Sequence, residues 1–520
     1  RDLIVTGVQT CALPIYMLLR ALVLFLFLAS TSFAEGLTLE RAVESTLTLQ
    51  ADILYGKLSA ESSERAREGA GGPFDHVLSS SAEIAHAQTP LNETEKKLYK
   101  RDVLKTEPQT YSLKLPKLTR SGTGIATTAS VLNSNDVTPS LTQPRESAAT
   151  LGVAVNFPIF DLLMENTSTT YEKIARENTR TVLNDYFFQA STSVYQTVVN
   201  FWSYLAAYER LMIYRDNEQN TRNMLADFEK LVKTGERPRA DAIQIRANLA
   251  VRHGQVVEGE RDLDTAGAEL ARSMGVAYDG TALPLPEGRW VEVENIGTPG
   301  VDESIQRACE KRFDIRSLES AVRSSELMLD ASRRVVKPDL DFYVSADFSD
   351  KGPHVSGDVV DNARTVKAGV VFSTPLGKRS AKSDLAQREI ELRQKSLRLA
   401  NAKRKASFDV SSAIRELEQN LKAHAFAMET VKLYQESLRI EEEKLKIGMS
   451  TVIDVISIRE NYQNALVSRI ESLRQVAVSL AGVLYDSGDL VTVDKDRISV
   501  NSAAFYSLDG KGGGPAASRQ

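Results

Sequence analysis

The feature that most restricts the fold of this chain is an internal duplication. Gly235–Asn248 aligns with Gly448–Asn461, and six positions of the two segments carry the same residue. Two further pairs match in the same order: Leu151–Phe160 with Ala368–Gly377, and Leu39–Ile53 with Val301–Ile315. Three ordered matches indicate two copies of one supersecondary unit. We expect each copy to contain a helix, a strand, a loop, a second strand and two long helices joined by a turn.

Composition and breaker residues predict five parts. Met17–Ala34 has an arginine, an apolar run and small residues before a cleavage point, which is the form of a secretory signal peptide. Its apolar run is too short to cross ~30 Å of hydrocarbon. Residues 1–16 are interpreted as a non-native leader. The repeats are expected at 35–290 and 291–488, next to a proline-rich linker, and 489–520 is expected to be a flexible C-terminal tail.

Two long segments carry a seven-residue apolar repeat. The first contains Phe187, Val194, Phe201 and Tyr208 with Val198, Leu205 and Met212; the second contains Val410, Leu417, Val431, Leu438 and Leu445 with Ile414, Leu421 and Met428. Such patterns predict helices that supercoil around each other. No proline interrupts residues 166–234, and a helix of about 69 residues would span roughly 100 Å. Residues 380–447 are expected to match it, with His424 as a buried helix-contact residue rather than a ligand.

Four segments alternate apolar and polar residues over about the length of a membrane-spanning strand. They are Leu78–Ile84, Leu151–Phe157, Leu340–Phe348 and Val366–Phe372. A soluble β-sandwich shows the same alternation but usually needs about seven strands. In lipid four strands cannot stand alone, because an open edge leaves backbone groups unpaired. Three copies would pool twelve strands, and the segment Ala87–Ala149 is expected to be an enlarged external loop.

The motifs LTLERAV, NFPIFD, STPLGKR and GMSTVIDVISIRENYQNAL, together with the duplication, resemble the TolC-like outer-membrane efflux proteins from about Leu37 to Tyr485. The resemblance implies a mixed fold, in which a homotrimer forms a twelve-stranded β-barrel in outer-membrane lipid and a long α-helical coiled-coil barrel in the periplasm. It also implies a periplasmic adaptor protein and an inner-membrane pump as partners. The expected function is the exit duct of a tripartite efflux or type I secretion system.

The resemblance places the functional end at the two helix turns. Gly235 and Gly448 suit the ends of helices and are expected at the turn tips. In the family the helix after the second turn lines the periplasmic aperture, so Asp454 becomes a candidate gate residue. Its repeat partner Asp241 is a candidate gate or pore residue as well, although it could instead face a groove between helices. A ring of such acids would attract cations. The alternative is that Asp454 only helps to start a helix.

Other classes of function receive little support from the sequence. The five histidines are scattered without an HExxH pair, and neither a GxSxG elbow nor a phosphate-binding loop occurs, so we predict no enzyme, no cofactor and no metal site. The net charge of −5 gives no sign of a nucleic-acid partner. The remaining alternative is a periplasmic coiled-coil adaptor protein, which shares long helical hairpins but does not need duplicated strands of membrane length.

Overall fold

The computed structural model describes residues 36–100, 102–134, 146–160, 167–278, 280, 283–352, 363–374, 376–494 and 497–507. The expected leader and signal peptide lie outside these residues. The chain divides into two compact units. A helical unit is drawn from Arg1–Leu58, Asn184–Arg316 and Ala402–Gln520, and a strand unit from Ser59–Leu183 and Ser317–Asn401.

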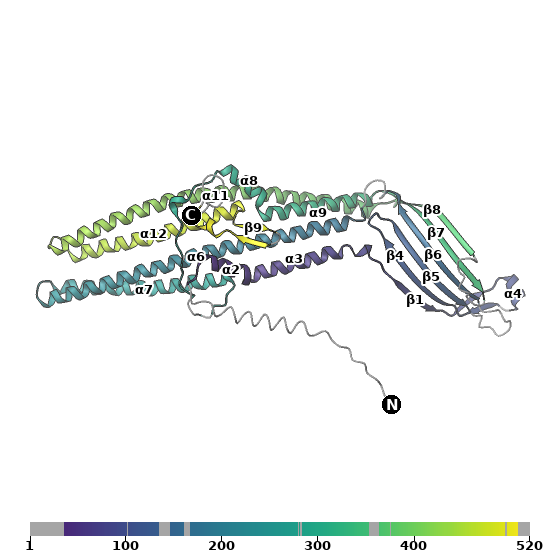
Figure 1. The fold of residues 1–520 in the computed structure, drawn as a ribbon, viewed down its shortest axis with the longest axis horizontal. Coiled ribbons are helices and arrows are strands. Elements are labelled where there is room, and N and C mark those ends of the chain that lie inside the picture. Colours follow the sequence, from purple (N-terminus) through teal and green to yellow (C-terminus); the bar gives the residue numbers. More distant parts are fainter. Residues whose placement is uncertain are drawn as a thin grey trace, which may run out of the picture. The chain divides into compact units, whose positions relative to one another are not determined.

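Four helices of the first half of the chain recur in the same order in the second half (Figure 1). The first half contains α2 (Leu39–Leu49), α3 (Ala51–Gly69), α6 (Thr170–Lys233) and α7 (Arg239–Met274); the second contains α8 (Val301–Lys311), α9 (Phe313–Val335), α11 (Arg379–Lys446) and α12 (Val452–Ser487). The two long helices predicted from the apolar repeat are α6 and α11. Within the described ranges, no helix combines the length and apolar content needed to cross a membrane.

The seven-residue repeat identifies much of the core of the helical unit. Val194, Val198 and Phe201 are fully buried on α6, and Val410, Ile414 and Leu417 are buried on α11. Met212 and Met428 are exceptions, with 44% and 36% of their surface exposed. The prediction for His424 is confirmed: its side chain is buried, and its Nδ1 atom lies 2.9 Å from the Ser472 hydroxyl of α12. Burial lowers the pKa of His424, which favours a neutral packing residue.

The strand unit contains an antiparallel sheet of six strands in the order β1-β4-β5-β6-β7-β8. The strands are β1 (Ser79–Ile84), β4 (Gln109–Leu118), β5 (Gly124–Ser134), β6 (Glu146–Pro158), β7 (Asp339–Gly352) and β8 (Ala363–Ser373). The four predicted strand segments correspond to β1, β6, β7 and β8. The expected count of four strands per chain is wrong, because β4 and β5 lie between β1 and β6 in the same sheet.

The two additional strands come from the segment that was expected to be an external loop. Residues 87–149 contain β4, β5 and the start of β6, and also a small unit of β2 (Ala87–Pro90), α4 (Glu93–Tyr99) and β3 (Val103–Thr106). Tyr111–Leu115 of β4 alternates apolar and polar residues, but the alternation of β5 is weak, because threonine and serine occupy many of its positions. β5 pairs with β6, and β4 pairs with β5 and β1, which illustrates how strand formation depends on neighbours more than on local preference.

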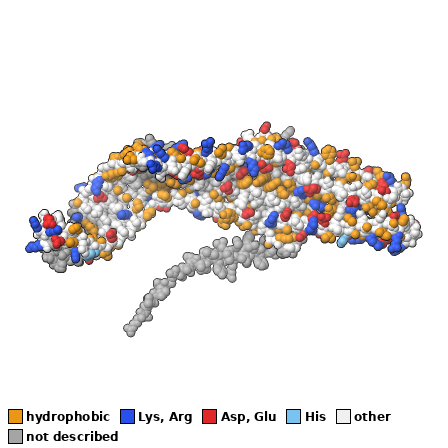
Figure 2. All heavy atoms as spheres, turned by 180° about the vertical axis from the view of Figure 1, so that it is seen from behind, with side chains coloured by type: hydrophobic (Ala, Val, Ile, Leu, Met, Phe, Trp, Pro, Cys, Tyr) orange, Lys and Arg blue, Asp and Glu red, His pale blue; other side chains and the backbone are white. Residues whose placement is uncertain are grey.

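One face of the sheet is apolar and the other polar. Val155 pairs with Val344 and Phe157 with Phe342, and the last two rings stack with centroids 6.2 Å apart. On the opposite face Lys367 lies 3.7 Å from Asp347. Charged side chains are sparser over the strands than over the helices on the face seen in Figure 2. This division is typical of strands that border lipid on one side.

The C-terminal segment is more ordered than the sequence predicts. Residues of the expected flexible tail form β9 (Val491–Asp494), β10 (Arg497–Val500) and the 3₁₀ turn η4 (Ser502–Phe505). Phe505 is buried, and the Tyr506 carbonyl accepts a 2.9 Å hydrogen bond from the Glu292 amide. The Tyr506 ring also meets Trp202 edge-on, with centroids 5.9 Å apart. These contacts fix Phe505 and Tyr506 to the helical unit, which corrects the expectation of a mobile tail there.

Candidate functional site at the helix turns

Both predicted glycines lie in turns between long helices. Gly235 follows α6 with φ +79°, and Gly448 follows α11 with φ +77°, a backbone region that favours glycine. After each glycine an amide reaches back to the preceding helix: Glu236 donates to the Leu231 carbonyl at 2.9 Å, and Met449 to the Lys444 carbonyl at 2.8 Å. These bonds satisfy the last helix carbonyls and end the helices cleanly.

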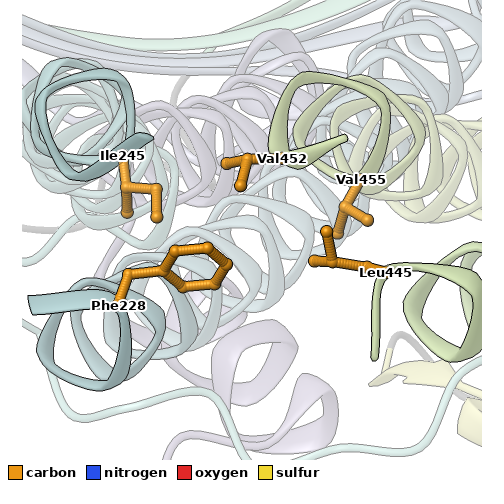
Figure 3. Packing of buried hydrophobic residues seen from close by; sticks show 5 residues of the cluster. All are labelled: Phe228, Ile245, Leu445, Val452 and Val455. Atoms are coloured by element: carbon orange, nitrogen blue, oxygen red, sulfur yellow. The ribbon is translucent and has the colours of Figure 1, made fainter. Parts of the chain in front are cut away.

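The two turns belong to one packed structure. Phe228, Ile245, Leu445, Val452 and Val455 form a buried cluster, here called the tip cluster, with side chains pointing toward one another from the four helix ends (Figure 3). Ile245 and Val455 are fully buried. The cluster therefore joins the α6–α7 hairpin to the α11–α12 hairpin within one chain.

An arginine adds a polar link beside the tip cluster. The guanidinium of Arg237 donates a 3.1 Å hydrogen bond to the Leu445 carbonyl, at the end of α11. The same group lies 5.9 Å from the centroid of the Phe228 ring, within the range of a cation–π contact. Arg237 thus satisfies one terminal helix carbonyl while covering the apolar cluster.

Asp454 has a defined position at the start of α12. Thr451 and Asp454 form a capping box: the Asp454 amide donates to the Thr451 hydroxyl at 3.3 Å, and the Asp454 carboxylate accepts from the Thr451 amide at 3.1 Å. The Thr451 hydroxyl also donates to this carboxylate at 2.6 Å. These hydrogen bonds lower the pKa of the exposed Asp454 carboxyl. Asp454 is therefore ionised at neutral pH and supports the start of the helix.

Asp241 occupies the corresponding place in the first repeat without the same cap. It lies in the first turn of α7 and is half-buried, and its amide donates to the Pro238 carbonyl at 3.2 Å. Pro238 precedes the helix and makes no side-chain capping bond. Asp241 and Asp454 thus lie in the first turns of α7 and α12, the helices that follow the two glycine turns.

A buried polar group that the sequence analysis did not identify lies further along these helices. Arg252 of α7 is only 3% exposed in its side chain and donates to the Gln463 amide oxygen at 2.9 Å. Asn217 of α6 donates to the same oxygen, and Glu460 lies 3.6 Å from the guanidinium. Burial lowers the pKa of Arg252. We call Asn217, Arg252 and Gln463 the polar layer.

The seven-residue spacing of the sequence contains a signal for the polar layer. Arg252 lies seven residues after buried Ile245, and Gln463 lies seven residues before buried Ile470. Polar residues at apolar heptad positions commonly fix the register of helices at a cost in stability. A groove of about 470 Å³ lies beside the layer, lined by residues that include Asp216, Glu442 and Tyr462.

The similarity to known proteins agrees with this architecture. Residues 304–484 match the family model described as outer membrane efflux protein. The resemblance to the outer membrane efflux protein family is confirmed. This family consists of transport proteins and not of enzymes. A comparison with curated protein sequences gives no match.

Solved outer-membrane channels share the fold over most of the chain. The Campylobacter jejuni CmeC outer membrane channel is 14% identical with a TM-score of 0.60, covering 87% of this chain and 85% of its own. The outer membrane protein VceC from Vibrio cholerae is 12% identical with a TM-score of 0.59, covering 86% and 96%. The open state of the Neisseria gonorrhoeae MtrE outer membrane channel is 14% identical with a TM-score of 0.60, covering 86% and 88%.

Proposed function

We propose that this chain forms a homotrimeric exit duct that carries cargo from the periplasm across the outer membrane. The observation that supports it most is the combination of a family match with a sheet that has one apolar and one polar face. The duct would use the sheet to pass through outer-membrane lipid and the long helical hairpins to reach into the periplasm. The cargo would be small molecules or secreted proteins, and the partner pump would determine which of them is exported.

The tips of the hairpins are the proposed contact for a periplasmic adaptor protein, which would connect the duct to an inner-membrane pump. Ile447, Met449 and Ile453 surround the second turn and are 70%, 75% and 57% exposed. Exposed apolar side chains at one end of a molecule commonly mark an interaction surface. An adaptor that offers apolar side chains of its own would cover them.

Cell fractionation separates the duct from the alternative of an adaptor protein. The proposal expects a trimer in the outer membrane that resists sodium dodecyl sulfate and dissociates only on heating, and that conducts ions in a planar lipid bilayer. A monomer attached to the inner membrane that forms no channel would support the adaptor and refute the duct.

Cysteine labelling tests the orientation of the strand unit. Ser356, between β7 and β8 in the sequence, lies outside the described residues, whereas Glu93 of α4 and Ser121 of the β4–β5 turn are exposed at opposite ends of β4. We expect a bulky maleimide to label Glu93→Cys in intact cells and Ser121→Cys only after the outer membrane is broken. Cys309, the one cysteine among the described residues, is replaced by serine in both variants. Labelling in the reverse pattern would refute this orientation.

The gate is proposed to include Asp454, with Asp241 of the first repeat as a second candidate. Three copies of an ionised acid near a threefold axis would favour cations over anions. Asp454→Asn removes the charge but keeps an oxygen that can accept the Thr451 hydrogen bonds, so it separates charge from capping. We expect this variant to lower cation preference in single-channel recordings. Thr451→Ala weakens the cap alone and is the matched control.

Unchanged cation preference and unchanged block by divalent cations in Asp454→Asn would mean that the acid only starts the helix. The gate would then lie elsewhere.

A further inference from the structure

The internal duplication shows which strands are additional. β7 follows α9 and pairs directly with β8, which precedes α11. In the first repeat β1 follows α3 and β6 precedes α6, but these two strands do not pair. β4 and β5 lie between them in the sheet. The β4–β5 hairpin is therefore an insertion into the first repeat.

The inserted hairpin has the length and register of its neighbours. β4 has 10 residues and β5 has 11, close to the ~9–11 residues of a membrane-spanning strand. One apolar row runs across four strands, from Leu113 to Ala129 to Leu151 to Phe348. On the other face Ser112 pairs with Ser130 and Ser130 with Thr150. Both faces of the sheet thus continue through the insertion without interruption.

The turn of the hairpin is fixed in place. Arg120 donates two hydrogen bonds to the Glu172 carboxylate of α6, at 3.0 and 3.2 Å, and lies over the Phe74 ring. Gly122 has φ +86°, and a Cβ atom there would meet the Ser168 hydroxyl at 2.8 Å. The turn is therefore packed against the segments that enter and leave the sheet, which distinguishes it from a loose surface loop.

We propose that each copy contributes six strands to the outer-membrane wall, and that three copies close a barrel of eighteen strands. The inference rests on the proposed trimeric duct. The partner at each open edge is a second copy of this chain, with β8 of one copy pairing with β1 of the next. Neighbouring strands in the sheet alternate in direction, so the first and the last of six strands, β1 and β8, run in opposite directions. The junction between two copies is therefore antiparallel, like every other pair in the sheet.

Closure in this way leaves no unpaired strand edge in lipid. Eighteen strands fall within the even numbers found in bacterial outer-membrane barrels. Barrel diameter grows about linearly with strand number, so the wall would be about half again as wide as one of twelve strands. The duct would therefore admit cargo of larger cross-section at its outer end.

Cysteine pairs in the full chain test the strand order. In a Cys309→Ser background, Ser81→Cys with Ser112→Cys places thiols where the hydroxyl oxygens of β1 and β4 lie 2.8 Å apart. We expect this pair to form a disulfide within each copy in the outer membrane. Ala82→Cys with Leu151→Cys, which joins β1 to β6, is the matched control and should stay reduced. A disulfide in the control pair and none in the first would overturn the proposal.

The junction between copies has its own test. Ala82→Cys is combined in turn with Val366→Cys, Ala368→Cys or Val370→Cys on β8. We expect one combination to give a covalent trimer on oxidation, whereas no covalent oligomer from any of the three would overturn the proposal.

Barrel width gives a further measurement. In a second variant residues 87–145 are replaced by residues 353–362, so that β1 and β6 are joined as β7 and β8 are. Electron cryomicroscopy of the trimers in lipid nanodiscs should show a barrel narrower by about one third. Equal diameters would overturn the proposal, and if the variant does not assemble, the cysteine pairs decide. A full chain that never forms outer-membrane trimers would instead refute the proposed duct.

Discussion

Replacing Phe342 and Val344 together by aspartate is expected to keep the chain out of the outer membrane. Both side chains lie on the apolar face of β7, where Phe342 pairs with Phe157 and Val344 with Val155. A charge that faces lipid near the midplane costs on the order of 2 kcal/mol, and two such charges add. The double variant should accumulate as a periplasmic monomer, as measured by membrane fractionation and by electrophoresis without heating.

A charge on the opposite face of the same strand is the control. Ser345 lies between Phe342 and Phe348 on β7, faces the polar side and pairs with Lys367. Ser345→Asp should assemble like the wild type, because an aspartate there meets a lysine and water instead of lipid. Normal trimers from the Phe342 and Val344 double variant would show that the faces of the sheet are assigned the wrong way round.

Periodicity predicted the elements whose pattern is strong. The heptads of α6 and α11 extend over many turns, so single exceptions such as Met212 do not hide them. The start of α12 was predicted only as the alternative role of Asp454. The spacing of Thr451 and Asp454, which is that of a capping box in front of an apolar run, also indicates this start. Both patterns depend on residues that are close together in the chain, so they can be recognised in a single sequence.

The elements that the sequence missed depend on distant partners. Thr127 and Thr128 sit in the middle of β5, where they give no clear alternation, yet pairing with Val153 and Gly152 of β6 makes them part of the sheet. The C-terminal residues after Asp489 look mobile because they are short and glycine-rich toward the end. Phe505 is nevertheless buried, in contacts that no local pattern reveals.

The candidate site was predicted only in part, because some of its residues have a local signal and others depend on distant partners. Gly235 and Gly448 mark the turns because a left-handed backbone conformation favours glycine, whatever the tertiary surroundings. The polar layer was missed because Arg252 looks like any surface arginine unless its heptad position is compared with that of Ile245. What brings Asp454 to a pore axis would be the arrangement of three copies, which no pattern within one chain encodes.

Truncating Ile245 to alanine is expected to loosen the contact between the two helical hairpins. Ile245 is fully buried in the tip cluster, and removing such a side chain typically costs about 2–5 kcal/mol. If the whole of this free energy is lost from the contact between the hairpin tips, the state in which the tips are separated becomes roughly 30- to 3,000-fold more populated. Each 1.4 kcal/mol corresponds to a factor of about ten in the equilibrium constant. Limited proteolysis near Gly235 and Gly448 should become faster, and the channel should open more often in a planar bilayer.

Ile243→Ala is the matched control, because Ile243 lies two residues away on α7 and is 58% exposed. The same atoms are removed there without leaving a cavity in the tip cluster, so proteolysis and channel opening should stay at wild-type rates. Faster cleavage together with unchanged channel opening in Ile245→Ala would show that the tip cluster stabilises the hairpins without closing the duct. Equal effects of the two variants would mean that the contact between the hairpins does not depend on burial of Ile245. The comparison thus separates packing that merely holds the helices together from packing that keeps the periplasmic end closed.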